Sequence, residues 1–329
     1  MTEVVTLGEC LIAFVATSPG PLAEAHTFER FVAGAEANVA IGLARLGHSV
    51  AFIGRVGADG FGETITRRLR GEGVETRALT SDPEATTGLM FRERRVLGPA
   101  QVVYARRDSA GSRLTVTDVD RAAQAGVFDR ARWLHLTGIT PAISPGARAA
   151  TERAVDLARA AGLTISLDLN LRRRLWSDEA AAPVLRALAA RVDVLFGSPD
   201  ELAVVTGLAA DDDPTDLTRA AMALGPGVAV ATLGAGGALA IERHAPDLRV
   251  ARSAVPLPVV VDPVGAGDAF CAGFIAARLD RLDLAAALEM ANACGAAAAA
   301  TLGDQTGLPD RDELAAILRA DVGAPDTIR

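Results

Sequence analysis

The order of strand-like and helix-like segments after Asp108 restricts the possible folds of this chain more than any other feature. Short apolar runs that are typical of strands alternate with longer segments that have the apolar spacing of helices. The strand-like runs are Trp133–Thr137, Thr164–Asp168, Val194–Gly197 and Val228–Thr232, and the helical segments lie near Pro145–Ala161, Ala180–Arg191, Pro199–Thr206 and Leu217–Leu224. Such alternation requires crossover connections, which place helices on both faces of a mainly parallel sheet. The sequence therefore predicts an α/β fold with a mainly parallel central sheet flanked by helices.

Segments at both ends of the chain extend this pattern. Strands are expected at Val4–Gly8 and Ser49–Ile53, and helices at Asn38–Leu46, Gly60–Leu69, Asp268–Leu279, Leu284–Ala300 and Arg311–Leu318.

Residues 11–33 and 86–106 break the pattern, because their β-rich runs have Gly and Pro turns but no helix between them. The runs are Leu11–Val15, Thr27–Val32, Gly88–Arg94 and Gln101–Arg106. We expect a small β-sheet that projects from a core formed by residues 1–10, 34–85 and 107–329. A sheet over the strand ends would act as a lid and exclude water. The alternative is an extension of the edge of the main sheet.

Composition excludes several classes of protein. Half of the 329 residues are hydrophobic, and the net charge is −8 with basic residues scattered among acidic ones, which argues against nucleic acid as a partner. All 33 basic residues are Arg. The absence of Lys excludes ordinary P-loop nucleotidases, Schiff-base aldolases and pyridoxal enzymes, which all need a Lys amine.

The remaining composition predicts a cytoplasmic protein without a membrane span. The three cysteines, at 10, 271 and 294, have no metal-ligand spacing and are expected to be reduced. The N-terminus leads directly into a strand, so no signal peptide is expected. The Ala-rich stretch near Ala296 lacks the ~20 bulky apolar residues of a membrane helix.

The strongest functional motif is Asp262–Phe270, with the sequence Asp-Pro-Val-Gly-Ala-Gly-Asp-Ala-Phe, followed by a helical pattern through Leu279. A glycine-rich turn at a helix start presents backbone N–H groups and the helix dipole to anions. A carboxylate placed there, Asp268, is suited to take a proton from a hydroxyl that attacks a phosphoryl group. The alternative is that Asp268 only caps the helix.

Polar residues and glycines also follow three of the predicted strands. They are Asp168, Asn170 and Arg172 after one strand, Ser198 and Glu201 after the next, and Gly234, Gly236 and Gly237 after the third. In parallel α/β sheets, ligands bind beyond the carboxyl ends of the strands, so these residues are candidates for one site.

Three segments, Gly34–Asn38, Gly54–Asp59 and Asp262–Phe270, make the chain similar to PfkB-type (ribokinase-like) carbohydrate kinases over essentially its whole length. Among these it most resembles 2-keto-3-deoxygluconate kinases (2-dehydro-3-deoxygluconokinases). The narrower resemblance rests on Gly111-Ser112 within Ser109–Arg113, on His135–Pro141 and on Gly303-Asp304.

The resemblance implies a ribokinase-like fold with a β lid, and ATP and Mg²⁺ as cofactors. It implies that Gly265, Ala266 and Gly267 form an anion hole beside the base Asp268. The ATP-binding residues it implies are Asn170, Arg172, Ser198, Glu201, Thr232, Gly234, Gly236, Gly237 and Asn292. Glu201 would organise Mg²⁺ through water. Ser198 stands where the family carries Asn, which puts that contact in question.

For the acceptor, the resemblance implies binding by Gly34, Ala35, Asn38, Met90, Tyr104, Arg106, Arg172 and Asp304. A guanidinium fork binds a carboxylate bidentately, so the two Arg residues suit a sugar acid. Arg106 and Asp304 discriminate better than Arg172, whose pattern related fructokinases share. The alternative for Arg106 is an exposed strand charge. Met90 and Leu171 stand where family members often carry Tyr, which bears on acceptor preference.

The sequence therefore predicts an ATP-dependent kinase that converts 2-keto-3-deoxygluconate to its 6-phosphate. A fructokinase or another sugar kinase of the family is the alternative, and a catalytically silent sugar-binding regulator is a remote one. A nicotinamide-dependent oxidoreductase is disfavoured, because Gly8-Glu9-Cys10 lacks the Gly-x-Gly-x-x-Gly fingerprint after the first strand. A homo-oligomer formed through the lid sheet is also expected.

Overall fold

The structure is a computed structural model that describes residues 2–95, 100–252 and 254–319. The chain divides into two compact units. Unit 1 comprises residues 1–40 and 49–163, and unit 2 comprises residues 41–48 and 164–329. Helix α1 (Ala35–Arg45) contributes residues to both units.

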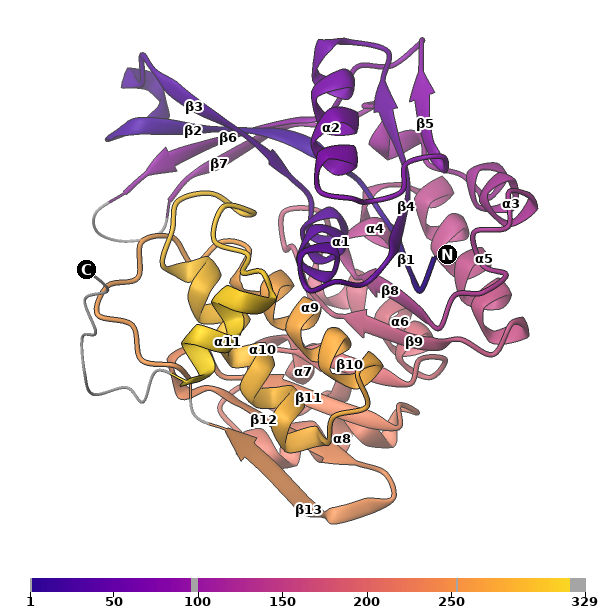
Figure 1. Cartoon of the computed structure of the whole chain (residues 1–329), viewed down its shortest axis with the longest axis vertical. Helices are drawn as coiled ribbons and strands as arrows, with labels where there is room; N and C mark the ends of the chain where they lie inside the picture. Colours follow the sequence, from indigo (N-terminus) through magenta and orange to yellow (C-terminus); the bar gives the residue numbers. More distant parts are fainter. Residues whose placement is uncertain (1, 96–99, 253, 320–329) are drawn as a thin grey trace. The chain divides into compact units, whose positions relative to one another are not determined.

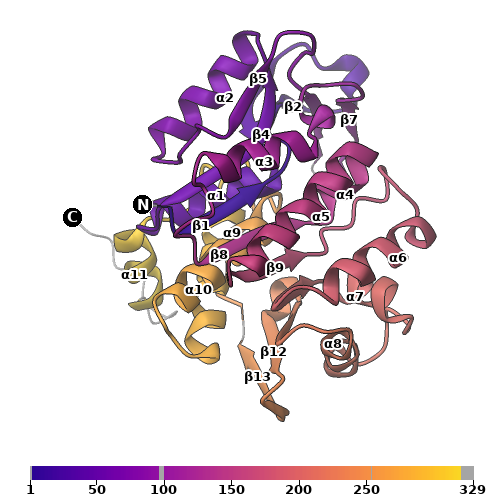
Figure 2. The same ribbon diagram turned by 90° about the vertical axis from the view of Figure 1, so that its right-hand side faces the viewer.

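Unit 1 contains four parallel strands in the order β8-β1-β4-β5. They are β1 (Val4–Leu7), β4 (Val50–Gly57), β5 (Leu79–Asp82) and β8 (Trp133–Thr137). All residues of β1 and β8 are buried, as expected for parallel strands covered on both faces. The helices are α2 (Gly60–Gly71), α3 (Val116–Gln124), α4 (Ile139–Ile143) and α5 (Pro145–Ala160). Figure 2 shows α3 and α5 side by side next to these strands.

A second, four-stranded sheet in unit 1 has the order β3-β2-β6-β7 (Figure 1). Its strands are β2 (Leu11–Pro19), β3 (Phe28–Ala33), β6 (Leu89–Arg94) and β7 (Val102–Ala105). Strand β2 pairs antiparallel with β3 and parallel with β6, and β7 closes the sheet antiparallel to β6. The predicted small sheet is therefore confirmed, and its interpretation as an edge extension of the main sheet is wrong.

Side chains alternate between the two faces along each strand, and both faces of the small sheet carry apolar residues. Leu11, Ala13, Ala33 and Met90 form a buried cluster on one face, with Phe31, Val102 and Tyr104 packed against it. The opposite face carries aromatic rings. Phe14 stacks on Phe91 with ring centroids 5.3 Å apart, and it meets Phe61 of α2 edge-on at 5.9 Å. These contacts fasten the sheet to α2, and the buried cluster around Met90 lies on the other face of the sheet.

Unit 2 contains three parallel strands, β9, β10 and β11, extended by the antiparallel strands β12 and β13. Their bounds are Thr164–Asp168, Val194–Gly197, Val228–Thr232, Ala238–Glu242 and Ala245–Arg252. The helices are α6 (Asp178–Ala189), α7 (Pro199–Thr206), α8 (Pro214–Ala223), α9 (Ala266–Leu279), α10 (Leu284–Ala299) and α11 (Arg311–Arg319). Helices α6, α7 and α8 contact one another in sequence, and α9 packs along α10 (Figure 1). Phe196 of β10 meets Phe270 and Phe274 of α9 edge-on.

The predicted strands and helices are confirmed, with boundaries shifted by a few residues. Five α-helices and β-strands in the described chain had not been proposed from the sequence: α3, α4, β5, β12 and β13. Strand β5 has only four residues and three of them are polar, and β12 and β13 form an antiparallel hairpin after the parallel series. Helix α3 carries two Asp residues among nine, which weakens its apolar pattern.

A buried ion-pair network connects β4, β5 and α3 within unit 1. Arg55 Nε lies 2.9 Å from Asp118 Oδ2 and 3.0 Å from Oδ1, and Arg55 Nη1 lies 2.9 Å from Asp82 Oδ2. Asp118 also accepts hydrogen bonds from Thr115 at the start of α3. Arg55 is only 19% exposed, and the side chain of Asp118 is fully buried. The Gly54–Asp59 motif therefore has a structural role at this position.

Replacement of Arg55 by Met should destabilise the protein, because it leaves the Asp82 and Asp118 carboxylates buried without this cation. We expect the free energy of unfolding in urea to fall by about 3–5 kcal/mol. Arg153→Met is the matched control, since Arg153 pairs with Asp120 at a partly exposed position, and it should cost less than about 1 kcal/mol. Similar small losses for both variants would contradict this role of Arg55.

Candidate functional site

Asp268 lies in the first turn of α9, which begins after a left-handed glycine. Gly265 has φ +83°, and a Cβ atom at this position would lie 2.7 Å from the backbone oxygen of Asp304. Only glycine fits this turn without strain. The Asp268 side chain is buried, at 7% exposure, and lies at the positive end of the helix dipole.

Two glycines of unit 2 border open space. A Cβ atom added to Gly267, next to Asp268, or to Gly234 would meet no other atom within 4 Å. Backbone without a side chain at a helix start suits the close approach of a phosphate. The predicted anion hole at Gly265, Ala266 and Gly267 therefore has room for such a group.

Asn170 connects Asp268 to a second carboxylate. Its Nδ2 donates to Asp168 Oδ2 at 3.1 Å and to Asp268 Oδ1 at 3.3 Å. The Asn170 backbone is left-handed, with φ +36°, a conformation that Asn tolerates better than most residues. The Oδ1 atom of Asn170 is buried without a hydrogen-bond partner in the protein, so it can accept a hydrogen bond from a ligand or from water.

The carboxylates around Asn170 influence one another. Burial raises the pKa of Asp168 well above its ordinary value, and the charges of Glu201 and Asp268 raise it further. The exposed Arg172 acts in the opposite direction on the same pKa. The charges of Asp168, Asp268, Glu201 and Arg172 therefore act on one another within unit 2.

Ser198 and Glu201 form a capping box at the start of α7. Glu201 Oε2 accepts from the Ser198 backbone N–H at 2.9 Å, and Oε1 accepts from the Leu171 N–H at 2.7 Å. This capping box gives the Ser-x-x-Glu spacing a structural role at the start of α7. Among the described residues, no group of three or more Asp, Glu, His or Cys side chains is arranged to hold a metal ion. These residues fit a Mg²⁺ ion bound through water and nucleotide phosphates, and they do not form a protein cage.

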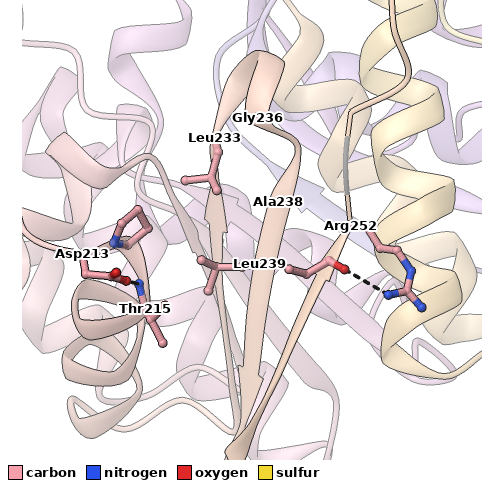
Figure 3. A pocket seen from close by; sticks show the side chains of 9 residues that line it. Asp213, Thr215, Leu233, Gly236, Ala238, Leu239 and Arg252 are labelled. Carbon is pink, nitrogen blue, oxygen red and sulfur yellow. Dashed lines mark hydrogen bonds between the residues drawn. The ribbon is translucent and has the colours of Figure 1, made fainter.

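The predicted nucleotide loop follows β11 and borders a cavity of about 320 Å³ (Figure 3). Leu233 and Gly236 line it from the loop, and Asp213 and Thr215 line it from the start of α8. Thr232 pairs with Ala238 across the hairpin, and Gly234–Gly236 form a 3-10 turn followed by Gly237. Asn292 of α10 is buried, and its Nδ2 donates to the backbone oxygen of Arg252, another lining residue, at 3.2 Å.

In unit 1, Gly34 precedes α1 in a conformation that only glycine adopts easily, with φ +140°. A Cβ atom there would lie 2.4 Å from the backbone oxygen of Glu9. Ala35 and Asn38 follow in the first turn of α1, and both are buried. The predicted acceptor segment is therefore packed directly against the end of β1.

The other predicted acceptor residues of unit 1 lie at the small sheet. Met90 and Tyr104 are cross-strand partners on β6 and β7. Arg106 follows β7 with its guanidinium carbon 5.2 Å from the centre of the Tyr104 ring. Arg106 is buried, at 9% exposure, so its interpretation as an exposed strand charge is wrong.

Glu9 is a neighbour of Arg106 that the sequence analysis did not select. Its carboxylate forms an ion pair with Arg106 Nη2, and it accepts a hydrogen bond from Ser109 Oγ at 2.9 Å. Burial raises the pKa of Glu9, whereas the Arg106 charge and the hydrogen bonds lower it. Glu9 lies two residues after the end of β1, so the strand-end rule that selected Asp168 would also have selected it.

The predicted residues thus fall into two groups, one in each unit. Unit 1 holds Gly34, Ala35, Asn38, Met90, Tyr104 and Arg106, and unit 2 holds Asn170, Arg172, Ser198, Glu201, Thr232, Gly234, Gly236, Gly237, Gly265, Ala266, Gly267, Asp268, Asn292 and Asp304. All three cysteines are buried and unpaired, and burial raises the pKa of each thiol, which makes them packing residues. No helix in the described ranges combines the length and hydropathy that a membrane crossing requires.

The fold and the turn at α9 define a ribokinase-like α/β protein. The Ribokinase II structure from Escherichia coli, in complex with ATP and Mg²⁺, superposes with a TM-score of 0.88 at 26% identity, over 97% of this chain and 99% of that one. A family profile described as pfkB family carbohydrate kinase matches residues 1–311. The chain therefore belongs to the pfkB family of carbohydrate kinases.

Relatives in this family include two kinds of sugar kinase. The 2-dehydro-3-deoxygluconokinase of Bacillus subtilis strain 168 is 37% identical over 324 residues, which cover 97% of this chain and 96% of that protein. Fructokinase-1 of Oryza sativa subsp. japonica is 35% identical over 330 residues, covering 96% of this chain and 98% of that protein. The two identities differ too little to choose between the acceptors.

The raised pKa of Asp168 predicts how the free energy of unfolding depends on pH. A carboxyl whose pKa rises on folding binds its proton more tightly in the folded state, so the free energy of unfolding falls as the pH rises from 3.8 through the raised pKa. Asp168→Asn removes this penalty. The difference in Tm between the variant and the unmodified protein should therefore grow in favour of the variant as the pH rises from 3.8 through the raised pKa.

Thermal unfolding followed by circular dichroism measures this difference. Asp283→Asn is the matched control, because Asp283 caps α10 at an exposed position and Asn is an equally good cap. That variant should show no comparable growth with pH. A Tm difference for Asp168→Asn that is constant or that shrinks with rising pH would contradict the shifted pKa.

Proposed function

We propose that this protein is an ATP-dependent sugar kinase that phosphorylates 2-keto-3-deoxygluconate at its primary hydroxyl and produces the 6-phosphate. The observation that carries this proposal is the buried carboxylate of Asp268 in the first turn of α9, beside a glycine turn with open space for an anion. A carboxylate in that position is unfavourable for anion binding alone. It is suited to receive a proton from an attacking alcohol.

In the proposed reaction, the acceptor oxygen forms a bond to the γ-phosphorus of ATP, and the bond from that phosphorus to the β–γ bridging oxygen breaks. Asp268 takes the hydroxyl proton, and the backbone N–H groups of the α9 turn stabilise charge on the transferring group. Bound Mg²⁺ would neutralise charge on the nucleotide phosphates, and Glu201 would hold it through water. The Asn170 side chain donates to Asp268 Oδ1 and so helps to orient the carboxylate.

The acceptor assignment rests on Arg106. A buried guanidinium with Tyr104 against one face is suited to hold a carboxylate, which 2-keto-3-deoxygluconate carries and neutral sugars lack. Arg172, Asp304, Gly34 and Asn38 would complete acceptor binding, as the family resemblance implies. Relatives named 2-dehydro-3-deoxygluconokinase and relatives named fructokinase are similarly close, so the choice depends on Arg106.

Fructose phosphorylation is the second candidate, and one observation favours it. Glu9 already balances the charge of Arg106, so an uncharged acceptor would leave no unpaired charge at this position. Met90 also supplies no hydroxyl to a sugar acid. A catalytically silent regulator is less well supported, because Asp268 and the complete glycine turn are both present.

We also propose a role for the small sheet, an assembly of two copies and a location for the enzyme. The sheet would act as a lid that excludes water from the acceptor, with Met90 and Tyr104 on its inner face. Two copies would associate through this sheet. A cytoplasmic location fits the three unpaired cysteines.

Asp268→Asn tests the catalytic role. The amide keeps the shape of the side chain but cannot accept the proton, so kcat should fall about 10²–10⁴-fold while ATP and acceptor still bind. A coupled ADP-release assay measures the rate, and calorimetry measures binding. Asp283→Asn again serves as the control and should keep normal turnover. Near-normal turnover of Asp268→Asn would reject the assignment.

A panel of acceptors tests the substrate. The unmodified protein should show its highest kcat/KM with 2-keto-3-deoxygluconate or its galactonate epimer, ahead of fructose, ribose and nucleosides. Arg106→Ala should raise the KM for the sugar acid at least about ten-fold, since it removes a charge-assisted pair. A higher kcat/KM for fructose in the unmodified protein would favour the fructokinase assignment.

A further inference from the structure

Glu9 is a buried carboxylate of unit 1 that takes no direct part in the proposed reaction. It is 3% exposed, and both of its oxygens face specific partners in the same unit. Oε1 accepts from Ser109 Oγ at 2.9 Å, and Oε2 forms the ion pair with Arg106. An acidic side chain is rarely buried unless it is paired, and Arg106 is the charged partner of Glu9.

Two glycines pack against the Glu9 side chain. A Cβ atom at Gly111 would lie 2.3 Å from Glu9 Cγ, and one at Gly88 would lie 2.8 Å from Glu9 Oε1. Any larger residue at either position would displace the carboxylate. Gly111 and Ser109 therefore act together, one by giving space to Glu9 and the other by hydrogen bonding to it.

Arg106 is held by Glu9 but is not saturated. Its Nη2 is paired with Glu9, and its guanidinium lies 5.2 Å from the Tyr104 ring centre. Its Nε is buried and has no hydrogen-bond partner in the protein. A buried charged donor without an acceptor is unfavourable unless a ligand supplies one. A carboxylate would supply it.

We propose that Glu9 is a positioning residue that fixes the Arg106 guanidinium for an acceptor carboxylate, and so gives the enzyme its preference for sugar acids over neutral sugars. This inference rests on the proposed function. An Arg side chain loses much rotamer freedom when it binds a ligand. Glu9, held by Ser109, orders the Arg106 side chain when the protein folds. The loss of rotamer freedom then occurs on folding and not on binding, so the acceptor binds more tightly.

Glu9→Gln is the direct test, because it removes the charge and keeps the size of the side chain and an acceptor for Ser109. Steady-state kinetics of the full chain with ATP would be measured with 2-keto-3-deoxygluconate and with fructose. The KM for the sugar acid should rise about ten-fold or more, since the ion pair that holds Arg106 is lost. By contrast, we expect a change of less than about three-fold in each of the KM for ATP, the KM for fructose and the kcat.

Two further variants separate positioning from general destabilisation. In an Arg106→Ala background, Glu9→Gln should have no additional effect on the sugar-acid KM, because the residue it positions is gone. Asp118→Asn, which disturbs the buried Arg55 pair in the same unit, should lower stability and leave the ratio of the two acceptor KM values unchanged. If Glu9→Gln does not fold, Ser109→Ala replaces it, with an expected rise of about two- to five-fold for the sugar acid only.

Several results would overturn the positioning role. They are an unchanged sugar-acid KM in Glu9→Gln, an equal rise for fructose, or a fall in the sugar-acid KM, which would mean that Glu9 competes with the acceptor. The unmodified protein is assayed first, and a preference for fructose at that stage would reject the proposed substrate and this inference together. A sugar-acid preference that survives Glu9→Gln unchanged would reject only the role of Glu9.

Discussion

The concentration of negative charge beside the start of α9 is the constraint on which the rest of the site depends. Asp268 lies in the first helical turn, and Asn170 joins it to the buried Asp168. Burial raises the pKa of Asp168, and repulsion by the neighbouring like charges raises it further. The helix dipole and the Asn170 amide offset part of this repulsion. Such an arrangement costs stability, and proteins accept that cost where a reaction requires it.

The proposed acceptor residues of unit 1 have a different arrangement of charge. Arg106 and Glu9 are both buried and face each other as a pair of opposite charge. A buried pair of this kind contributes little net stability. Its value lies in fixing the direction of the guanidinium donors, which is a property of binding specificity. The small sheet contributes through Tyr104, whose ring lies against the same guanidinium.

Much of the fold could be predicted because its signals are local. Alternating strands and helices identify a parallel sheet, and the strand-end rule selected Asp168, Asn170, Ser198 and Glu201. The capping box of Ser198 and Glu201 is also visible in the spacing of the two residues. By contrast, the burial of Arg106 could not be predicted, because it depends on Glu9, which lies far away in the sequence. The left-handed backbone of Asn170, which directs its amide at Asp168 and Asp268, likewise has no marker in the sequence.

A crystal structure with a non-hydrolysable ATP analogue and 2-keto-3-deoxygluconate would test the central claim most directly. The claim is that the Asp268 carboxylate receives the proton of the attacking alcohol. The primary hydroxyl of the acceptor should lie about 2.6–3.2 Å from an Asp268 carboxylate oxygen and face the γ-phosphorus. A complex in which that hydroxyl is hydrogen-bonded to another side chain, with Asp268 out of reach, would contradict the account.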